Sequence, residues 1–472
     1  MQPTRRDFFA SSLGGLGGLA LTDLLARDLY ANGNRPKAEF NGGLHHRAKV
    51  KRVVQLFMNG GASPMDTFDY KPELIKRHGQ QVDVGLKVTA TGTPGPVMKS
   101  PFAWKQHGQC GRWVTDVFPH MATCVDDMAF LMAMKSKTNV HGPASYLQNT
   151  GFLLPGFPCA GAWIGYALGR LTDNLPSFVV LPDPRGLPYN GMGNFTAGFL
   201  PALHQGTLIN PSAATPIPDL VASSQAKSIT ANASVEGLAL LKQMNQGYAI
   251  DRPGDSRLDA RVSSYELAAK MQTAAPEAFD LSKESQVIHR RYGTDRPASD
   301  GGFARNCLLA RRLLERDVRF VQVWSGAGGA ANNWDNHGNI ANELPPIARQ
   351  VDQPIAALLH DLKARGLFDD TLVIWTTEFG RMPFTQAGTG RDHKGGSFVT
   401  WLAGGGIRGG SSYGVSDEFA YQAAEDITTC YDLHATILHL MGIDHEKLSV
   451  RQNGIDRRLT DVHGHVIEEI LV

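Results

Sequence analysis

Carboxylate and imidazole side chains recur in short polar clusters along this sequence. Carboxylate oxygen and imidazole nitrogen are the side-chain groups that bind divalent cations in the absence of clustered cysteines. The clusters include NGGASPMD, WDNHGN, TTEFGR and GRDHKGG. The candidate metal ligands are therefore Asp66, Asp335, His337, Glu378, Asp392 and His393.

Basic and amide side chains in the same clusters are candidates for contact with a substrate. Cationic groups neutralise phosphate or sulfate, and imidazole can transfer a proton. We assign catalytic roles to His141 of HGPAS, Arg381 and Lys394, and substrate binding to Arg391 and Asn59.

Each cluster also has a purely structural interpretation. The segment WDNH can form a surface turn, and Asp392 with His393 can cap the next element. Glu378 and Arg381 can form an ion pair with no metal. The functional interpretation rests on several such clusters following predicted strands.

The elements that would position these residues alternate between strands and helices. Strands are predicted in KRVVQLFMNGG, DDMAFLMAMKS, LPSFVVLPDP, VRFVQVWSGAGG, TLVIWTTEFGR and GGSFVTWLAGGG. Apolar residues at 344, 347, 351, 355, 358 and 362 have helical spacing, and Gly366 ends that helix. A late helix in TTCYDLHATILHLMGI ends at Gly442. This alternation predicts a parallel or mixed sheet with helices on both faces, and ligands bind at the carboxyl edge of such sheets.

Composition and missing motifs exclude several classes of function. The 472 residues carry a formal net charge of +1, so no general electrostatic attraction to nucleic acid is expected. The segment NGGASP after the first predicted strand is not GxGxxG, and the pattern GxxxxGK[ST] does not occur, so a Rossmann or P-loop nucleotide site is not expected. The five cysteines form no CxxC pair, which argues against a cysteine-bound zinc, and Cys110–Cys124 is a candidate disulfide.

The N-terminus has the features of an export signal. Arg5 and Arg6 precede Phe8, Phe9 and a mildly apolar Gly/Leu/Ala segment, a pattern that resembles a twin-arginine signal. We expect residues 1–31 to be the signal peptide, 32–47 a polar linker, and the mature protein to be periplasmic or in the cell envelope. A basic N-terminal helix of a cytosolic protein is the alternative. No later segment is apolar for long enough to span a membrane stably.

Five motifs resemble one family when they are taken in order. They are LFMNGGASPMDTFDYKPEL, WDNHGN, LKARGLFDDTLVIWTTEFGRMP, GRDHKGGSFVTWLAGGG and YDLHATILHLMGI. The combination resembles the DUF1501 family of exported bacterial proteins, in the alkaline-phosphatase-like superfamily with sulfatases and phosphatases. The resemblance implies an α/β fold, an alkaline-phosphatase-like central mostly parallel sheet with helices on both faces, over residues 48–472. Insertions are expected near 183–225 and 233–292.

The resemblance also suggests roles for individual residues. TTEFG is similar to the TSDHG of sulfatases and phosphatases, so Glu378 stands at a metal-binding Asp, while Phe379 replaces a metal-binding His. Asn59 stands at another metal-binding Asp, with Asp66 as a substitute. His141 stands where sulfatases carry the Cys that becomes formylglycine, so it could bind metal, act as a base or accept the transferred group.

These expectations define two hypotheses about function. The first is an exported metal-dependent hydrolase of phosphate or sulfate esters. It would hold one or two divalent metal ions (zinc, calcium, manganese or magnesium) and take an anionic ester such as a sulfated or phosphorylated glycan. The alternative is a non-catalytic exported scaffold, or a polysaccharide- or partner-binding protein, on a degenerate alkaline-phosphatase-like fold.

Overall fold

A computed structural model describes most of the chain beyond the predicted signal peptide. The described residues are 44–83, 94–211, 217, 231–250, 265–268, 270–271, 275–329, 331–386 and 388–472. The predicted signal 1–31 lies outside them, as do most of the linker 32–47 and parts of both predicted insertions.

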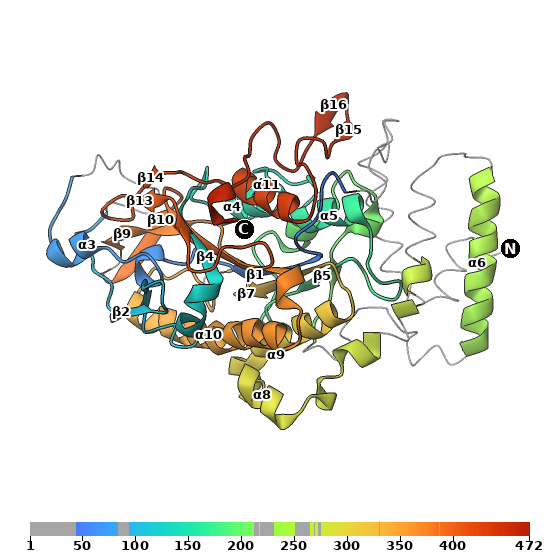
Figure 1. The fold of residues 1–472 in the computed structure, drawn as a ribbon, viewed down its shortest axis with the longest axis horizontal. Helices are drawn as coiled ribbons and strands as arrows, with labels where there is room; N and C mark the ends of the chain where they lie inside the picture. The colour runs from blue at the N-terminus through green and yellow to red at the C-terminus, as the bar shows by residue number, and fades with distance from the viewer. Residues whose placement is uncertain are drawn as a thin grey trace.

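An eight-stranded sheet forms the centre of the molecule (Figure 1). Its order is β12-β4-β11-β8-β1-β7-β5-β6. The strands are β1 (Arg52–Met58), β4 (Met128–Met134), β5 (Phe178–Leu181), β6 (Thr207–Leu208), β7 (Phe320–Ser325), β8 (Thr371–Thr376), β11 (Phe398–Gly404) and β12 (Ser412–Tyr413). All neighbours pair in parallel except β11, which is antiparallel to both β4 and β8. The predicted mostly parallel sheet is confirmed.

Side chains from the two faces of the sheet enter two separate cores. In β1, Val54, Leu56 and Met58 face one core, and Val53 and Phe57 face the other. All seven residues of β1 are buried, because helices cover the sheet on both sides. This explains why the strand, apart from Arg52 and Gln55, is apolar and lacks the regular polar alternation of a half-exposed strand.

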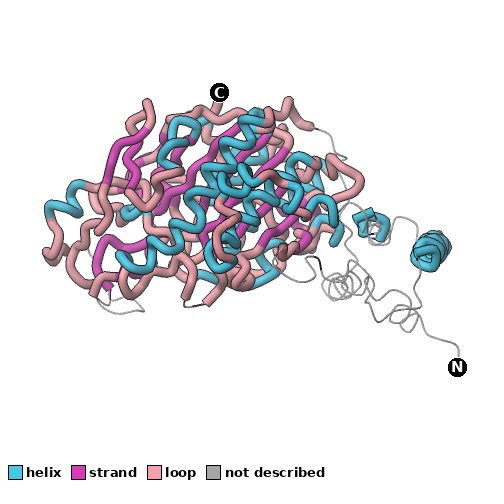
Figure 2. Tube along the Cα trace, turned by 90° about the horizontal axis from the view of Figure 1, so that it is seen from below, coloured by secondary structure: helices cyan, strands magenta, loops and turns pink. Residues whose placement is uncertain are grey.

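Helices α9 (Ala298–Glu315) and α10 (Ile340–Ala364) cover one face, and α5 (Ala160–Leu168) and α11 (Cys430–Leu440) cover the other. Figure 2 shows the helices crossing over the strands. The apolar positions that predicted a helix along α10 are all buried against the sheet: Leu344, Ile347, Val351, Ile355, Leu358 and Leu362. The two helical layers predicted from the sequence are confirmed.

Smaller elements complete the described part of the chain. Four hairpins are formed by β2 (Trp104–His107) with β3 (Arg112–Thr115), β9 (Gly380–Gln386) with β10 (Gly390–Lys394), β13 (Val415–Ser416) with β14 (Ala423–Glu425), and β15 (Val450–Gln452) with β16 (Ile455–Arg457). The remaining helices are α3 (Pro72–Lys76), α4 (His141–Thr150), α6 (Ala231–Ile250) and α8 (Gln286–Tyr292), with short 3-10 turns such as η1 (Pro64–Asp66). Helix α6 lies to one side of the sheet (Figure 1).

One local expectation differs from the structure. Cys110 and Cys124 do not form the candidate disulfide: all five cysteines are free thiols, with Cys110 exposed and Cys124 buried. The segment HGPAS, which follows the predicted strand DDMAFLMAMKS, begins helix α4, whose first residue is His141. No helix among the described residues is long and apolar enough to cross a membrane.

Candidate metal centre

The polar clusters that follow the strands lie at one edge of the sheet. Strands β1, β7 and β8 run in parallel, and β4 points the same way because β11 is antiparallel to both β4 and β8. Their carboxyl ends therefore face the same side. Gly60 follows β1, His141 follows β4, Asp335 follows β7 and Glu378 follows β8.

Two glycines allow the loop after β7 to approach its neighbours closely. A side chain on Gly60, whose φ is +121°, would collide with the backbone of Trp334 and Asp335. A side chain on Gly390 would overlap the backbone carbonyl of His337. Glycine at these two positions lets the loop sit between the end of β1 and the start of β10.

Four side chains converge at this edge. The carboxylate oxygen Oδ1 of Asp335 lies 2.7 Å from Nε2 of His337, 2.9 Å from Nε2 of His393 and 3.3 Å from Nε2 of His141. Ligand atoms of His141, Asp335 and His393 all lie within 4.8 Å of one another. His337 Nε2 lies 2.8 Å from His393 Nε2. We call these four residues the histidine cluster.

Each imidazole of the histidine cluster is oriented by an oxygen on its other nitrogen. Nδ1 lies 2.7 Å from the Glu378 carboxylate in His141, 2.5 Å from the Gln386 amide oxygen in His337, and 2.9 Å from the Asn139 carbonyl oxygen in His393. These oxygens only accept, so Nδ1 carries the proton in each ring. In the neutral rings the Nε2 lone pairs then point toward Asp335.

Arg381 brings one positive charge to this arrangement, because its guanidinium lies 3.3 Å from His337 Nε2 and 2.5 Å from the Asp335 carboxylate. Two unprotonated nitrogens at 2.8 Å repel each other unless a proton or a cation lies between them. Imidazole nitrogens and a carboxylate, with oxygen acceptors behind the imidazoles, are the ligand set and outer contacts of zinc sites. The residues present therefore fit a zinc ion or a similar transition metal.

The surroundings shift the pKa values of the cluster. Burial acts to raise the pKa of Asp335, but its contacts with three histidines and Arg381 outweigh burial and hold that pKa far below its usual range. Burial acts to lower the pKa of His141, but its hydrogen bonds to Asp335 and Glu378 outweigh it and raise that pKa. Burial lowers the pKa of His393, and this favours the neutral, metal-binding form.

Glu378, a predicted metal ligand, lies behind His141. It is fully buried, and its Oε1 accepts hydrogen bonds from Nδ1 of His141 and, at 2.8 Å, from the backbone N–H of Gly60. Its Oε2 accepts from the Thr377 hydroxyl at 3.0 Å. Glu378 thus orients a histidine, in the position that carboxylates take behind metal-bound imidazoles.

Arg381 supports Asp335 and is not available to a substrate. Its fully buried guanidinium donates to the Asp335 carboxylate at 2.5 Å, and also to the backbone carbonyls of Gly60 and Gly61. The alternative Glu378–Arg381 pair is thus replaced by an Asp335–Arg381 pair. The guanidinium fixes the carboxylate that faces the three histidines.

The other predicted site residues lie at different places. Asp66 and Arg391 are both fully buried and bind each other, with Nε to Oδ2 at 2.5 Å. Lys394 lies over the ring of Tyr421, 3.5 Å from its centroid, and burial lowers the pKa of Lys394 to about 8. Asn59 donates to the Gly326 carbonyl at 3.1 Å.

Asp392, the remaining predicted metal ligand, also lies outside the histidine cluster. Its Oδ1 accepts a hydrogen bond from the backbone N–H of His393 at 2.7 Å. Both residues lie within β10, so this contact caps no following element, and of the two only His393 belongs to the histidine cluster.

Three contacts of the site were not predicted from the sequence. Tyr189 stacks on His141 with ring centroids 4.3 Å apart and planes 5° apart, and burial, together with the charges of Asp335 and Glu378, raises the pKa of Tyr189 to about 12. Gln386 and the carbonyl of Asn139 orient two histidines. Little in the sequence marks these residues as part of the site. Tyr189 is one aromatic residue in a Gly/Pro-rich loop after β5, and Gln386 and Asn139 come close to the histidines only in the folded chain.

The fold and the site define an α/β protein with a candidate metal centre at the carboxyl edge of its sheet. The chain matches the model of the family described as "Protein of unknown function (DUF1501)" over residues 50–471, and it belongs to that family. The predicted resemblance is thus confirmed.

Several solved structures resemble this chain at low identity. The lipoteichoic acid synthase LtaP from Listeria monocytogenes is 9% identical, with 95% of this chain and 82% of that chain covered and a TM-score of 0.40. The PsFucS1 sulfatase from Pseudoalteromonas sp. is 13% identical (91% and 72% covered, TM-score 0.35). The alkaline phosphatase from the Antarctic bacterium TAB5 is 11% identical (84% and 99% covered, TM-score 0.34). No curated protein sequence matches the chain. We base the proposed function on the side chains of the site and not on these similarities.

Proposed function

We propose that the protein is an exported metal-dependent hydrolase of phosphate or sulfate esters. One observation carries this proposal. Three imidazoles, each with Nδ1 bound to an oxygen acceptor, direct Nε2 toward one carboxylate oxygen at the carboxyl edge of an α/β sheet. This arrangement serves cation binding, and ligands bind at this edge in open α/β sheets.

His141, Asp335 and His393 would hold the metal. Their imidazole-rich donor set favours zinc or another transition metal over calcium and magnesium, which prefer oxygen ligands. When bound, such an ion acts as a Lewis acid toward an ester oxygen and promotes the ionisation of water.

His337 is the residue of the histidine cluster best placed to exchange a proton with a substrate. Its side chain is 32% exposed, whereas the side chain of His141 is 10% exposed. Gln386 fixes the proton on Nδ1, and Nε2 contacts Asp335 at 2.7 Å and His393 at 2.8 Å, so a substrate would exchange a proton with Nε2 by replacing one of these contacts. Tyr189 covers one face of the His141 ring and shields that ligand from solvent.

Substrate charge must be met by groups other than the predicted basic residues. Arg381 and Arg391 are fully buried in ion pairs, and Lys394 lies on Tyr421. Among the described residues, the N-terminus of α4, where His141 is the first residue, would supply positive potential, and a bound metal would add to it. Anions are stabilised at helix N-termini by backbone N–H groups and the helix dipole.

Export remains part of the proposal and rests on the sequence TRRDFF near the N-terminus. A twin-arginine route carries folded proteins, which suits a chain that takes up its metal before export. The mature enzyme would act in the periplasm or cell envelope on an anionic ester, with a sulfated or phosphorylated glycan as the candidate substrate.

A non-catalytic scaffold is the second candidate, and one observation favours it. The hydroxyl nearest to His141 in its helix, that of Ser145, is fully buried and donates to Asn194 at 2.7 Å. It is therefore unable to act as a nucleophile. A hydrolase on this site would therefore use water or His141 as the nucleophile, whereas a scaffold needs no nucleophile.

Metal analysis of the untagged, exported full-length protein tests the proposal. We expect about one equivalent of zinc or another transition metal per chain by plasma mass spectrometry, and near-background metal in His393→Ala and Asp335→Asn, because each removes a ligand. The control His107→Ala, in β2, should keep its metal. Wild-type protein without metal at saturating supply would overturn the proposal.

Turnover separates the hydrolase from the scaffold. Aryl phosphates and aryl sulfates should be hydrolysed by the metal-loaded protein, with activity removed by a chelator and restored by the metal. A protein that holds the metal yet hydrolyses no ester in this panel would favour the scaffold.

A further inference from the structure

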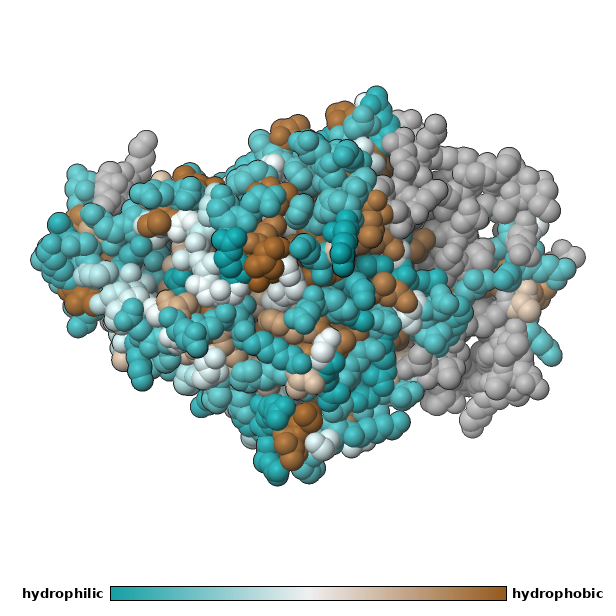
Figure 3. Space-filling view, viewed as in Figure 1, coloured by the Kyte–Doolittle hydropathy of each residue, from teal (hydrophilic) through white to brown (hydrophobic). Residues whose placement is uncertain are grey.

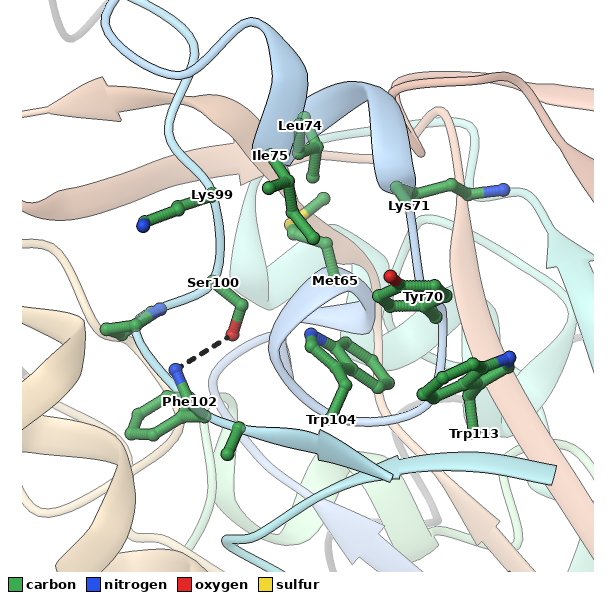
Figure 4. A pocket seen from close by; sticks show the side chains of 12 residues that line it. Met65, Tyr70, Lys71, Leu74, Ile75, Lys99, Ser100, Phe102, Trp104 and Trp113 are labelled. Carbon is green, nitrogen blue, oxygen red and sulfur yellow. Dashed lines mark hydrogen bonds between the residues drawn. The ribbon is translucent and has the colours of Figure 1, made fainter. Parts of the chain in front are cut away.

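A second concave site lies away from the histidine cluster. The pocket has a volume of about 480 Å³ and lies between helix α3, the segment 99–103 and the β2–β3 hairpin (Figure 4). Its size is in the range of small-molecule sites. None of the residues assigned to the metal centre lines it.

Aromatic rings form one wall of this pocket. Tyr70 stacks on Trp113 with centroids 4.3 Å apart, and Trp104 lies 5.4 Å from Tyr70. All three side chains are half-buried, so part of each ring faces solvent. Met65 and Leu74, which are buried, also line the pocket. The pocket therefore has a largely apolar lining with one open side.

Polar groups stand beside the apolar wall. Figure 4 shows the ring nitrogen of Trp104 and the hydroxyl of Tyr70 pointing toward the space between α3 and β2. The Ser100 hydroxyl accepts from the backbone N–H of Phe102 at 3.3 Å and keeps its own proton to donate. The planes of Tyr70 and Trp104 are tilted by 57°, so a ligand would stack on one ring and meet the other at an angle. An apolar wall with hydrogen-bonding groups at its edges suits a ligand with an apolar face and polar edges, as a sugar ring has.

The charged residues that line the pocket are basic. They are Lys71 and Lys99, and none of the twelve described lining residues is an aspartate or glutamate. Lys71 forms an ion pair with Asp69 at 3.2 Å, whereas Lys99 is exposed and its side chain extends away from the aromatic rings in Figure 4. An anionic substituent that reaches Lys99 would therefore lie outside the aromatic wall, on the Lys99 side of the pocket.

The pocket and the metal centre share one structural support, the β9–β10 hairpin. Met382 and Phe384 of β9 pack with Met65 and Leu74 of the pocket. Arg391 of β10 donates to the Met98 carbonyl at 3.1 Å, beside Lys99, and His393 of the same strand belongs to the histidine cluster. The hairpin therefore fixes both sites relative to each other.

We propose that this pocket is a glycan-binding subsite that holds one sugar ring against Tyr70 and Trp104, with an anionic substituent toward Lys99. The sugar ring follows from the pocket itself. The anionic substituent also rests on the proposed function, because a sulfated or phosphorylated glycan is the candidate ester. The pocket would hold a sugar of the chain whose ester lies at the metal centre.

The distribution of tryptophans gives a selective probe of this pocket. Five of the seven tryptophans have exposed fractions below 2%: Trp163, Trp324, Trp334, Trp375 and Trp401. Trp104 and Trp113 are the two half-buried ones. Quenching of tryptophan fluorescence by acrylamide in the full-length protein therefore reports on the pocket.

Binding would be measured with hexasaccharides of chondroitin sulfate, desulfated chondroitin, dextran sulfate and dextran. We expect at least one sulfated hexasaccharide to reduce acrylamide quenching and to give a saturable calorimetric titration. Trp104→Ala should weaken that binding by roughly tenfold or more, since it removes the stacking face. Lys99→Ala should weaken binding of the sulfated hexasaccharide more than binding of its unsulfated counterpart. It should also make the affinity for the sulfated hexasaccharide less dependent on salt concentration.

Lys105→Ala is the matched control. Lys105 follows Trp104 in β2, is exposed, and does not line the pocket, so its removal should leave binding unchanged. Trp104→Phe keeps an aromatic face and should retain most of the affinity, which separates loss of stacking from loss of folding.

The outcomes distinguish this proposal from the proposed function. Lost glycan binding in Trp104→Ala with unchanged hydrolysis of a small aryl ester supports the subsite. Glycan binding by a wild-type protein that hydrolyses no ester also supports it, while the proposed function fails. The proposal would be overturned if none of the four hexasaccharides reduced acrylamide quenching, or if Trp104→Ala bound the glycan as tightly as the wild type. It would also be overturned if a proline-rich peptide, tested in the same titration, bound more tightly than every hexasaccharide.

Discussion

At the residue scale, the position of Glu378 explains how one histidine becomes a ligand. An imidazole binds a cation through one nitrogen only if its proton stays on the other. The Glu378 carboxylate accepts the Nδ1 proton of His141, and the backbone N–H of Gly60 holds that carboxylate in place. Glu378 is fully buried, so it makes these contacts without competition from water.

Substitution of Glu378 should therefore lower metal affinity in two steps. Glu378→Gln keeps an oxygen acceptor but loses the charge, and we expect about tenfold weaker binding. Glu378→Ala removes the acceptor, and we expect about a hundredfold weaker binding. Competition with a chromogenic chelator measures both values.

The exposed Glu425→Gln is the control and should bind metal like the wild type. Equal affinities in Glu378→Ala and wild type would show that Glu378 does not orient a ligand. Circular dichroism spectra would establish that each variant is folded.

At the element scale, a buried histidine joins two helices that cover the sheet. His434 of α11 donates through Nε2 to the Gln148 carbonyl of α4 at 3.1 Å and is 2% exposed. Burial lowers the pKa of His434 to about 4. The folded protein thus keeps this ring neutral at a pH where the unfolded chain protonates it.

Stability should fall as the pH falls through this range. Between the unfolded pKa near 6.5 and the folded pKa near 4, the unfolded state binds more protons, so acid favours unfolding. From pH 7 to pH 4.5, His434 should contribute a loss of about 2 to 3 kcal/mol in the free energy of unfolding. Urea unfolding at the two pH values measures the loss.

The variant His434→Gln keeps a donor for the Gln148 carbonyl but cannot titrate. Between pH 7 and pH 4.5, the free energy of unfolding of this variant should fall by about 2 to 3 kcal/mol less than that of the wild type. The exposed His463→Gln should behave like the wild type. An unchanged pH dependence in His434→Gln would contradict the prediction.

At the scale of the whole molecule, one buried ion pair connects the two proposed sites. Arg391 binds Asp66 next to the pocket residue Met65, and it also donates to the carbonyls of Met98 and Met382. The Arg391 carbonyl in turn accepts from Arg381, which holds Asp335. Two arginines thus link the aromatic pocket to the metal centre through the β9–β10 hairpin.

Removal of one partner should destabilise the molecule strongly. In Asp66→Asn the Arg391 charge stays buried without its carboxylate, and we expect a loss of about 3 to 5 kcal/mol in the free energy of unfolding. The double variant Asp66→Asn/Arg391→Met should recover a large part of that loss, because no unpaired charge remains. Urea unfolding at pH 7 compares the three proteins.

Asp456→Asn is the control, because Asp456 forms an exposed pair with Arg451 and such pairs contribute little. A double variant as unstable as Asp66→Asn would show that packing, and not the unpaired charge, causes the loss.

The sequence by itself determined the sheet, its two helical layers and the edge where the site lies. Buried strands such as β1 and β8 are apolar runs, and α10 has helical spacing of apolar residues, because each pattern follows from local geometry and burial. The ends of parallel strands share one edge, so polar residues after several strands could be expected to meet there.

Only the tertiary structure decided which of those polar residues face one another. Glu378 and Asp335 both follow strands of the sheet, but their partners differ. Glu378 binds a histidine, whereas Asp335 binds histidines and also pairs with Arg381. The β9–β10 hairpin determines these pairings, because it places Arg381 and His393 against the loop that carries Asp335, about fifty residues earlier in the chain. Charge and residue type are properties of single positions, whereas pairing depends on distances that long-range packing fixes.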